Sequence, residues 1–162
     1  MDAVVRFEQV MQRFGETVAL RNVNLTVKPG TVTVLVGANG AGKSTTIRLC
    51  TGVLRPQSGA VEVFGIPTHS DARSIRRRCG VVPPKAAFYD RLTGRENLNY
   101  AAQLFRLSKP PIDREAERFG IADVLDRMVE GYSTGMRARL ALARSMLHDP
   151  ELLLFDEPTA GL

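Results

Sequence analysis

The sequence predicts an α/β fold in which the loops at the end of a parallel sheet carry the functional residues. Three features indicate this fold. An apolar run at 31–36 leads into a glycine-rich loop and a helical pattern, the segment 87–147 is helical in character, and a second apolar run at 152–155 returns to a strand. The chain has 162 residues, 44% of them hydrophobic, which is enough for one domain with a sizeable core.

Alternating apolar residues predict two half-buried strands near the N-terminus. Val5 and Phe7 alternate with polar residues in the first, and Val23, Leu25 and Val27 do so in the second. The run "TVTVLV" that follows is apolar and β-branched throughout. This composition predicts a strand buried on both faces, which ends at a glycine.

The next segment, "KSTTIRLCTGVL" at 43–54, predicts a helix with Ile47, Leu49 and Val53 among its apolar positions. Two short strands are expected after it, "AVEVFG" and "CGVVPP". The second ends in two prolines, which cannot continue a sheet ladder. The order is therefore strand, loop, helix, strand.

Helical signals dominate from residue 87 to about 147. Thr93 and Glu96 have the spacing of a capping box, and Leu98, Ala101 and Phe105 follow on one face. Short helices are expected near 113–119 and 121–127. A stronger helix begins after Gly131, with a single apolar stripe formed by Met136, Leu140, Ala143 and Leu147.

Composition limits the class of protein. The formal charge of +5 permits contact with nucleic acid or an anionic membrane surface but does not by itself indicate either. Cys50 and Cys79 belong to no metal-binding cluster and predict two reduced, packed thiols. The N-terminus has no signal-peptide pattern and no run is long enough to cross a bilayer, so a soluble, cytoplasmic protein is expected.

The loop "GANGAGKST" matches the phosphate-loop pattern G-x-x-x-x-G-K-[ST] in full and lies between an expected strand and an expected helix. Its glycines let successive N–H groups point at phosphate oxygens, and the helix adds its positive N-terminal dipole. Lys43 can neutralise phosphates, and the Ser44 hydroxyl can ligate Mg²⁺. The expected ATP-binding residues of this loop are Gly37, Asn39, Gly40, Ala41, Gly42, Lys43, Ser44 and Thr45.

Two adjacent acids, Asp156 and Glu157, follow the last apolar run. Enzymes with a phosphate loop need an acid at the end of a second buried strand, where it holds Mg²⁺. Asp156 is the expected metal ligand. Glu157 is the expected catalytic residue, because it can polarise the water that attacks the γ-phosphate. A solvated turn is the alternative for these acids taken alone.

With "GANGAGKST", "YSTGMRARLALA" and "LLLFDEPTAGL" in this order, the chain resembles the ATP-binding subunit of ABC transporters over essentially its whole length. The resemblance implies a P-loop NTPase fold: a parallel-sheet core, an N-terminal antiparallel β subdomain and an inserted helical subdomain. It further implies one ATP-binding domain over 1–162, with a nucleotide-binding core from 1–86 and 148–162 and a helical subdomain from 87–147.

The family's signature usually reads Leu-Ser-Gly-Gly-Gln, and the matching stretch here begins at Tyr132 and ends at Met136. Ser133 and Gly135 match the pattern, and the whole stretch is similar to that of single-domain exporter subunits. In the family, the signature contacts ATP on the opposite subunit of a head-to-tail dimer, so Ser133 and Gly135 are expected to act in trans. Phe14 matches the aromatic residue that stacks on adenine, although a core phenylalanine is the alternative.

The sequence departs from the family pattern in two places. The family has a glutamine that contacts Mg²⁺ and the attacking water where this chain has Pro84. A family member also continues after "AGL" with an aspartate, a strand and a histidine, so a fragment lacking the C-terminal part of the core is expected. Slow ATP hydrolysis or none is expected of the chain as given.

The resemblance implies an ATPase that powers transport by nucleotide-driven dimerisation. The expected partners are ATP, Mg²⁺, a second identical or paralogous ATP-binding subunit, and a separate transmembrane permease at the inner face of the cell membrane. One alternative is a module that binds ATP but hydrolyses it poorly. Another is a nucleic-acid- or ribosome-associated ATPase, because "RSIRRR" is basic, but a solvated helix face explains that segment better, since no aromatic residue interleaves.

Overall fold

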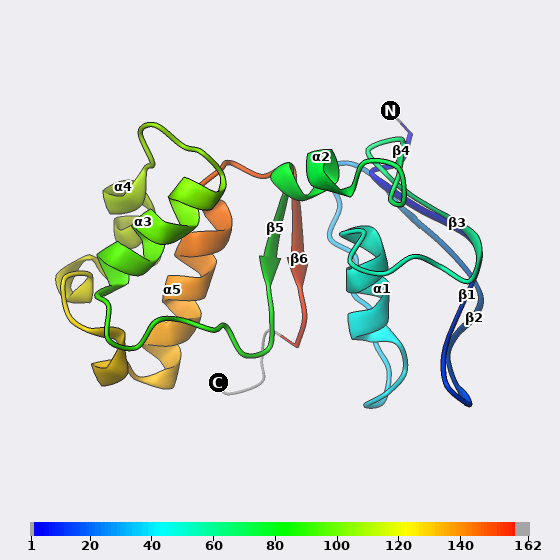
Figure 1. The fold of residues 1–162 in the computed structure, drawn as a ribbon, viewed down its shortest axis with the longest axis horizontal. Coiled ribbons are helices and arrows are strands. Elements are labelled where there is room, and N and C mark those ends of the chain that lie inside the picture. Colours follow the sequence, from blue (N-terminus) through cyan, green and yellow to red (C-terminus); the bar gives the residue numbers. More distant parts are fainter. Residues whose placement is uncertain (1, 158–162) are drawn as a thin grey trace. The chain divides into compact units, whose positions relative to one another are not determined.

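The computed structural model describes residues 2–157. The chain divides into two compact units, Met1–Arg76 and Arg77–Leu162. The first unit contains an antiparallel sheet and, among its described residues, two helices, and the second contains a bundle of helices and a parallel strand pair (Figure 1). The α/β class and the antiparallel N-terminal sheet predicted from the sequence are confirmed.

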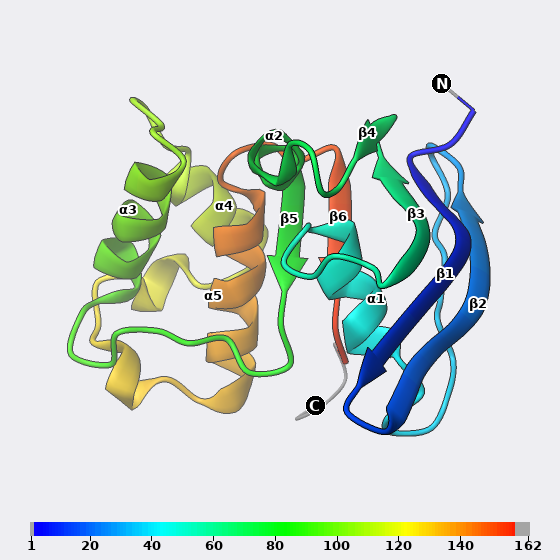
Figure 2. The ribbon, with the colours of Figure 1, turned by 45° about the vertical axis from the view of Figure 1, so that its right-hand side comes forward.

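The sheet of the first unit has four strands in the order β2-β1-β3-β4, and every pairing is antiparallel. Figure 2 shows β1 and β2 as long neighbouring ribbons joined by a tight hairpin. Between them, the turn contains Gly15 and Glu16. The strands are β1 (Val5–Phe14), β2 (Thr17–Val27), β3 (Ser58–Val63) and β4 (Ile66–Pro67).

One face of this sheet forms the core of the first unit. Val5 pairs with Val27 on one side and with Val63 on the other. This register puts the alternating apolar residues of β1 and β3 on the same face, because side chains alternate along a strand. The fully buried members are Phe7, Val10, Val61, Val63 and, from the helix α1, Leu49.

Helix α1 (Lys43–Cys50) is shorter than the sequence pattern predicts. Leu49 is buried as expected, but Val53 lies beyond the helix and is 64% exposed. The helix ends because Gly52 takes a left-handed backbone angle (φ 64°). The prediction of a helix over 43–54 that includes Val53 was therefore too long at its C-terminal end.

Residues 31–36 were predicted to form a strand buried on both faces, and this prediction was wrong. These residues form no strand, and Val32, Val34 and Val36 are 94%, 75% and 92% exposed. A strand is defined by its ladder of hydrogen bonds, and this segment pairs with no other strand among residues 2–157. High β-propensity does not make a strand without a partner.

The second unit contains a parallel pair of strands, β5 (Cys79–Val82) and β6 (Leu152–Phe155). Their register pairs Cys79 with Leu152 and Val82 with Phe155. Arg78 binds Glu151 through two hydrogen bonds of 2.6 and 2.7 Å, which joins the starts of the two strands. The hydrogen bonds from Arg78 lower the pKa of the Glu151 carboxyl.

The helical segments described in the second unit pack around one apolar core. Figure 1 shows their ribbons grouped together. These segments are α3 (Gly94–Leu104), α4 (Ile112–Arg118), the 3-10 turns η1 (Ala122–Val124) and η2 (Val129–Gly131), and α5 (Thr134–Met146). Helix α2 (Ala72–Arg77) precedes them and belongs to the first unit except for its last residue. The core residues include Leu98, Ala101, Ile112, Ala116, Ile121, Leu125, Val129, Tyr132, Leu140, Ala143 and Leu147.

The predicted capping box, the helix near 113–119 and the helix after Gly131 are confirmed, whereas the helix predicted near 121–127 is only the 3-10 turn η1. The Thr93 hydroxyl accepts a hydrogen bond from the Glu96 amide, and the Glu96 carboxylate accepts one from the Thr93 amide, so the capping box is complete. On α5, Leu140, Ala143 and Leu147 are buried, and Met136 packs against the same core.

His148, just after α5, is stacked on Phe105, with ring centroids 3.9 Å apart and an interplanar angle of 7°. Its Nε2 lies 3.0 Å from the Cys79 carbonyl oxygen, which fixes Nε2 as the protonated nitrogen of the neutral ring. Its Nδ1 is buried without a hydrogen-bond partner among the described residues. Burial lowers the pKa of His148 and raises that of Cys79 to about 12.

We predict that His148 makes the protein less stable as the pH falls. Because the folded-state pKa of His148 lies below the ordinary value of 6.5, the unfolded chain binds the proton more readily. The contribution of the neutral ring to the free energy of unfolding is fully present above about pH 6.5 and decreases as the pH falls through that value. Urea unfolding of the wild type and of His148→Gln between pH 7.5 and 5.5 measures this. A smaller pH dependence is expected for the variant.

His69 provides the control, because it is exposed. His69→Gln should leave the pH dependence of unfolding as it is in the wild type. If His148→Gln and wild type lose stability in parallel, the buried ring is not the source of the effect.

Candidate nucleotide-binding site

The glycine-rich loop of the first unit leads directly into α1. Helix α1 begins at Lys43, and Gly42 is its N-terminal cap with a left-handed backbone (φ 88°). The Lys43 ammonium group donates hydrogen bonds of 2.7 and 2.9 Å to the carbonyl oxygens of Gly37 and Ala38. The cation is therefore held across the loop, at the N-terminus of a helix whose first N–H groups attract anions.

Position 42 requires glycine for two reasons: its backbone angle is left-handed, and there is no room for a side chain. A Cβ atom at this position would lie 2.5 Å from the carbonyl oxygen of Ala19 and 2.6 Å from a methyl group of Leu20. Both residues belong to β2. The loop is therefore packed directly on the antiparallel sheet, and the Thr46 amide and hydroxyl both donate to the Gly42 oxygen, at 2.8 and 3.0 Å.

Of the residues predicted from the sequence, 37–42 form the loop and 43–45 form the first turn of α1. Gly37 to Ala41 are exposed, Lys43 and Ser44 are half-buried, and Thr45 is buried in the first turn of α1. Asn39 and Ala41 lie in the exposed part, and Ala41 closes the turn with a hydrogen bond from its amide to Ala38. The exposed backbone is what a phosphate group needs to reach these N–H groups.

Phe14 is the last residue of β1, at the hairpin turn. Its side chain is 46% exposed. This exposure excludes the alternative that Phe14 is a core residue. An exposed ring is free to stack on a planar ligand.

The acids predicted as metal ligand and catalytic base lie at the carboxyl end of β6, in the second unit. The Asp156 amide donates to the Val82 oxygen at 2.9 Å, which extends the parallel pairing by one residue. Glu157 follows with a left-handed backbone (φ 51°), which is uncommon for a residue with a side chain. Its side chain is exposed.

Pro84 lies two residues beyond the end of β5, so it follows the same edge of the strand pair as Asp156. It is exposed and has no polar side-chain group. At this position the chain can neither donate nor accept a side-chain hydrogen bond toward a metal or a water molecule.

Two arginines of α5 hold the segment that follows Pro84. Arg144 donates to the Ala87 oxygen at 2.8 Å and stacks over the Phe88 ring, with its guanidinium carbon 4.6 Å from the ring centroid. Arg137 forms an ion pair of 2.8 Å with Asp90. Burial lowers the pKa of Arg144. Sequence reasoning did not find these contacts, because an exposed-looking arginine on a helix has no distinguishing pattern.

Ser133 and Gly135 are at the start of α5. Ser133 is the N-cap, and its hydroxyl accepts a 3.2 Å hydrogen bond from the Met136 amide. Ser133 is exposed, Gly135 is half-buried, and the first turn contains no acid. No carboxylate in this first turn therefore competes with an anion for the amides at the start of the helix.

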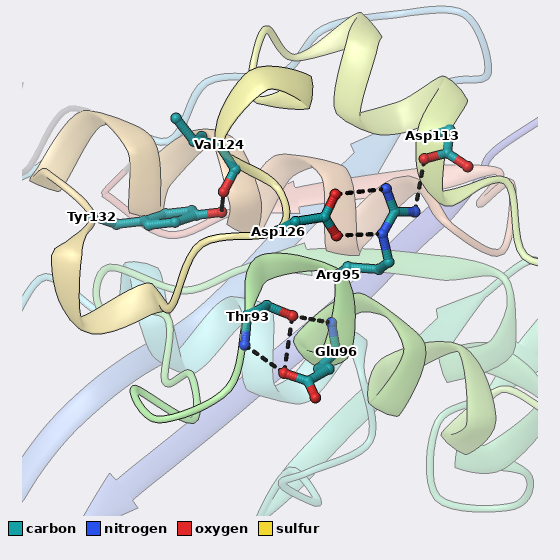
Figure 3. Close-up of polar contacts among 7 residues, drawn as sticks. All are labelled: Thr93, Arg95, Glu96, Asp113, Val124, Asp126 and Tyr132. Atoms are coloured by element: carbon teal, nitrogen blue, oxygen red, sulfur yellow. Dashed lines mark hydrogen bonds and ion pairs between the residues drawn. The ribbon is translucent and has the colours of Figure 1, made fainter.

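The α3 N-terminus supports the segment that leads to Ser133. Arg95 binds Asp126 with hydrogen bonds of 2.6 and 3.2 Å and Asp113 with one of 2.7 Å (Figure 3). The hydrogen bond from Arg95 lowers the pKa of Asp126. The capping box of Thr93 and Glu96 lies beside this network. Nothing in the spacing of these residues along the chain indicated the network.

The predicted residues thus fall into two sets. The first unit brings the phosphate loop together, with Phe14 on the sheet that supports it; the second unit brings Asp156 close to the end of β5 and places Ser133 and Gly135 at the start of α5. No cluster of three or more possible metal ligands occurs among residues 2–157. None of the helices in that range has the length and apolarity needed to cross a membrane.

Comparisons with known proteins identify the family. The family model described as "ABC transporter" matches residues 20–160. The chain is 41% identical over 149 residues to the ABC transporter ATP-binding protein NatA of Bacillus subtilis (strain 168), covering 89% of the chain and 61% of that protein. It is 37% identical over 163 residues to the bacitracin transport ATP-binding protein BcrA of Bacillus licheniformis, covering 100% and 53%.

A third relative is the daunorubicin resistance ATP-binding protein DrrA3 of Streptomyces coeruleorubidus, 39% identical over 165 residues. The alignment covers 99% of the chain and 52% of that protein, so the chain spans only about half the length of such relatives.

Solved structures agree with the sequence matches. CbiO1 from Clostridium perfringens, part of the ABC transporter complex cbiONQ, has a TM-score of 0.85 and 28% identity, over 100% of this chain and 68% of that one. A bacterial Atm1-family ABC exporter with ATP bound has a TM-score of 0.86 and 26% identity, over 99% and 30%. The phosphate loop, the signature and the acidic strand end therefore have one explanation: the chain belongs to the ABC transporter family, as a nucleotide-binding domain of it.

Proposed function

We propose that this chain binds ATP through residues 37–45 and hydrolyses it to power a transporter. The observation that carries the proposal is the Lys43 ammonium group, held by two loop carbonyls at the N-terminus of α1. In this position it meets the phosphates of a nucleotide, and the loop carbonyls release it to them because a phosphate is a stronger, charged acceptor. The curated relatives are ATP-binding proteins of transporters, which supports the same function.

The donor set fits Mg²⁺, which prefers one or two carboxylates together with hydroxyl, water and phosphate oxygens. Asp156 supplies a carboxylate and Ser44 a hydroxyl, and these two residues would hold the ion. When bound, it supplies charge neutralisation for the phosphates. Phe14, exposed at the end of β1, would stack on the adenine ring.

Glu157 is the proposed catalytic residue. Its exposed carboxylate can accept a proton from the water that attacks the γ-phosphate. Ser133 and Gly135 would contact the γ-phosphate of a nucleotide on a second, identical or paralogous subunit, through the open N-terminus of α5. ATP would then join two subunits head to tail.

The proposed partners are transmembrane permease subunits, with this chain at the inner face of the cell membrane. The name of the CbiO1 structure, part of a transporter complex, supports an assembly of this kind.

Pro84 favours a second candidate, a module that binds ATP but hydrolyses it slowly. It replaces the family's glutamine at the end of the parallel strand pair and offers no polar side-chain atom there. The nucleic-acid alternative has less support. In the basic segment "RSIRRR", Arg78 is bound to Glu151 and Arg76 donates a hydrogen bond of 3.1 Å to the Thr51 oxygen. Two of its arginines therefore already bind groups of the protein itself.

We predict that Lys43→Ala abolishes nucleotide binding and leaves the fold intact. The substitution removes the charge partner of the phosphates, while the backbone of the loop stays closed by the Ala41 and Thr46 hydrogen bonds. Titration with a fluorescent ATP analogue measures binding, and circular dichroism measures the fold. Lys28→Ala, which removes an exposed lysine outside the loop, is the matched control and should bind as the wild type does. Wild-type affinity in Lys43→Ala would refute the proposed site.

We predict that Pro84→Gln raises the rate of ATP hydrolysis at saturating ATP and Mg²⁺. A side chain that positions the attacking water can contribute about a hundredfold or more. Phosphate release measures the rate. Pro84→Ala separates the new amide from the mere loss of the proline ring and should hydrolyse at the wild-type rate. Equal rates in all three proteins would show that this position does not limit hydrolysis.

A further inference from the structure

We propose that Tyr132 and Gly94 form a matched pair that fixes the start of α5, so that Tyr132 is a positioning residue for Ser133. The inference rests on the proposed function, because Ser133 matters only if it binds a nucleotide. It gives a structural role to Tyr132, which stands where the family's signature usually has leucine.

Tyr132 lies in the core of the second unit with only 6% of its surface exposed. Its hydroxyl donates a 2.7 Å hydrogen bond to the Val124 carbonyl oxygen (Figure 3). Burial raises the pKa of this hydroxyl, so it remains a donor at neutral pH. The residue immediately before Ser133 is therefore held both by packing and by a directional bond.

Gly94 provides the space for this hydroxyl. A Cβ atom at Gly94 would overlap the Tyr132 hydroxyl oxygen and lie 3.1 Å from the Leu125 carbonyl oxygen. Gly94 begins α3 without a left-handed backbone angle, so any residue could adopt its conformation. Only the contact with Tyr132 and the adjacent backbone demands glycine.

The chain around this contact is tightly hydrogen-bonded. The Gly94 amide donates to the Arg127 oxygen at 3.2 Å and the Arg95 amide to the Leu125 oxygen at 2.9 Å. The Val129 amide donates to the Leu92 oxygen at 3.0 Å, and Arg95 adds its ion pair with Asp126. The start of α3 and the segment 124–129 therefore form one body, and Tyr132 is anchored to it.

This anchoring reaches Ser133 directly. The Tyr132 amide donates to the Val129 oxygen at 3.0 Å, and Ser133 caps α5 one residue later. A displacement of about 1 Å at a contact residue can cost about a hundredfold in rate. Leucine at position 132 would lack the hydroxyl and leave the space above Gly94 empty. Gly94 therefore provides the space, and the Tyr132 hydroxyl fills it.

A double-mutant cycle on the 162-residue chain tests the pairing. Urea unfolding is measured for wild type, Gly94→Ala, Tyr132→Leu and the double variant. We expect Gly94→Ala to lower the folding equilibrium constant about tenfold or more in the wild type, but less than about threefold beside Tyr132→Leu, where the hydroxyl is gone. An equal loss in both backgrounds would overturn the pairing.

Tyr132→Phe tests the positioning role, because it keeps the ring and removes only the hydroxyl. Under conditions where both proteins remain folded, we expect faster amide exchange at Ser133 to Met136 and about a tenfold higher protein concentration for ATP-driven association. The affinity for a fluorescent ATP analogue should not change. Tyr100→Phe, at an exposed tyrosine of α3, is the matched control. Unchanged exchange and association in Tyr132→Phe would overturn the role.

The two proposals fail in different ways. If the wild type binds no nucleotide or does not associate with ATP, the proposed function fails. The unfolding cycle and the amide exchange still decide whether Tyr132 and Gly94 fix the start of α5.

Discussion

The contact between Gly42 and β2 determines where the phosphate loop lies. Because the Ala19 oxygen and the Leu20 side chain occupy the space that a Cβ atom would need, the loop approaches the sheet backbone directly. The beginning of α1 is thereby fixed, and with it the position of Lys43. A rigid sheet supporting a short loop is what a binding site needs, since ligand-induced ordering would otherwise cost binding free energy.

Local patterns predicted well the features that depend on neighbours in the chain. The phosphate loop, the capping box of Thr93 and Glu96 and the apolar stripe of α5 each require a fixed spacing, so the sequence displays them. The family and the α/β class followed from the order of such motifs. The roles of the individual site residues are predictions that rest on these motifs.

Features that depend on residues distant in the chain were missed. Residues 31–36 had the composition of a buried strand, but pairing needs a partner, and composition does not supply one. Gly94 and Tyr132 are 38 positions apart and their fit appears only in three dimensions. The same holds for Arg144 and Phe88, whose contact no periodicity reveals.

The two arginine contacts of α5 also have a mechanical consequence. Arg137 and Arg144 are seven positions apart, so they emerge from nearly the same side of the helix, two turns from each other. They attach the segment 87–90 at two points about 10 Å apart along the helix axis. Two attachments resist rotation where one would act as a pivot. A load on that segment is therefore shared between two turns of α5 and does not fall on a single side chain.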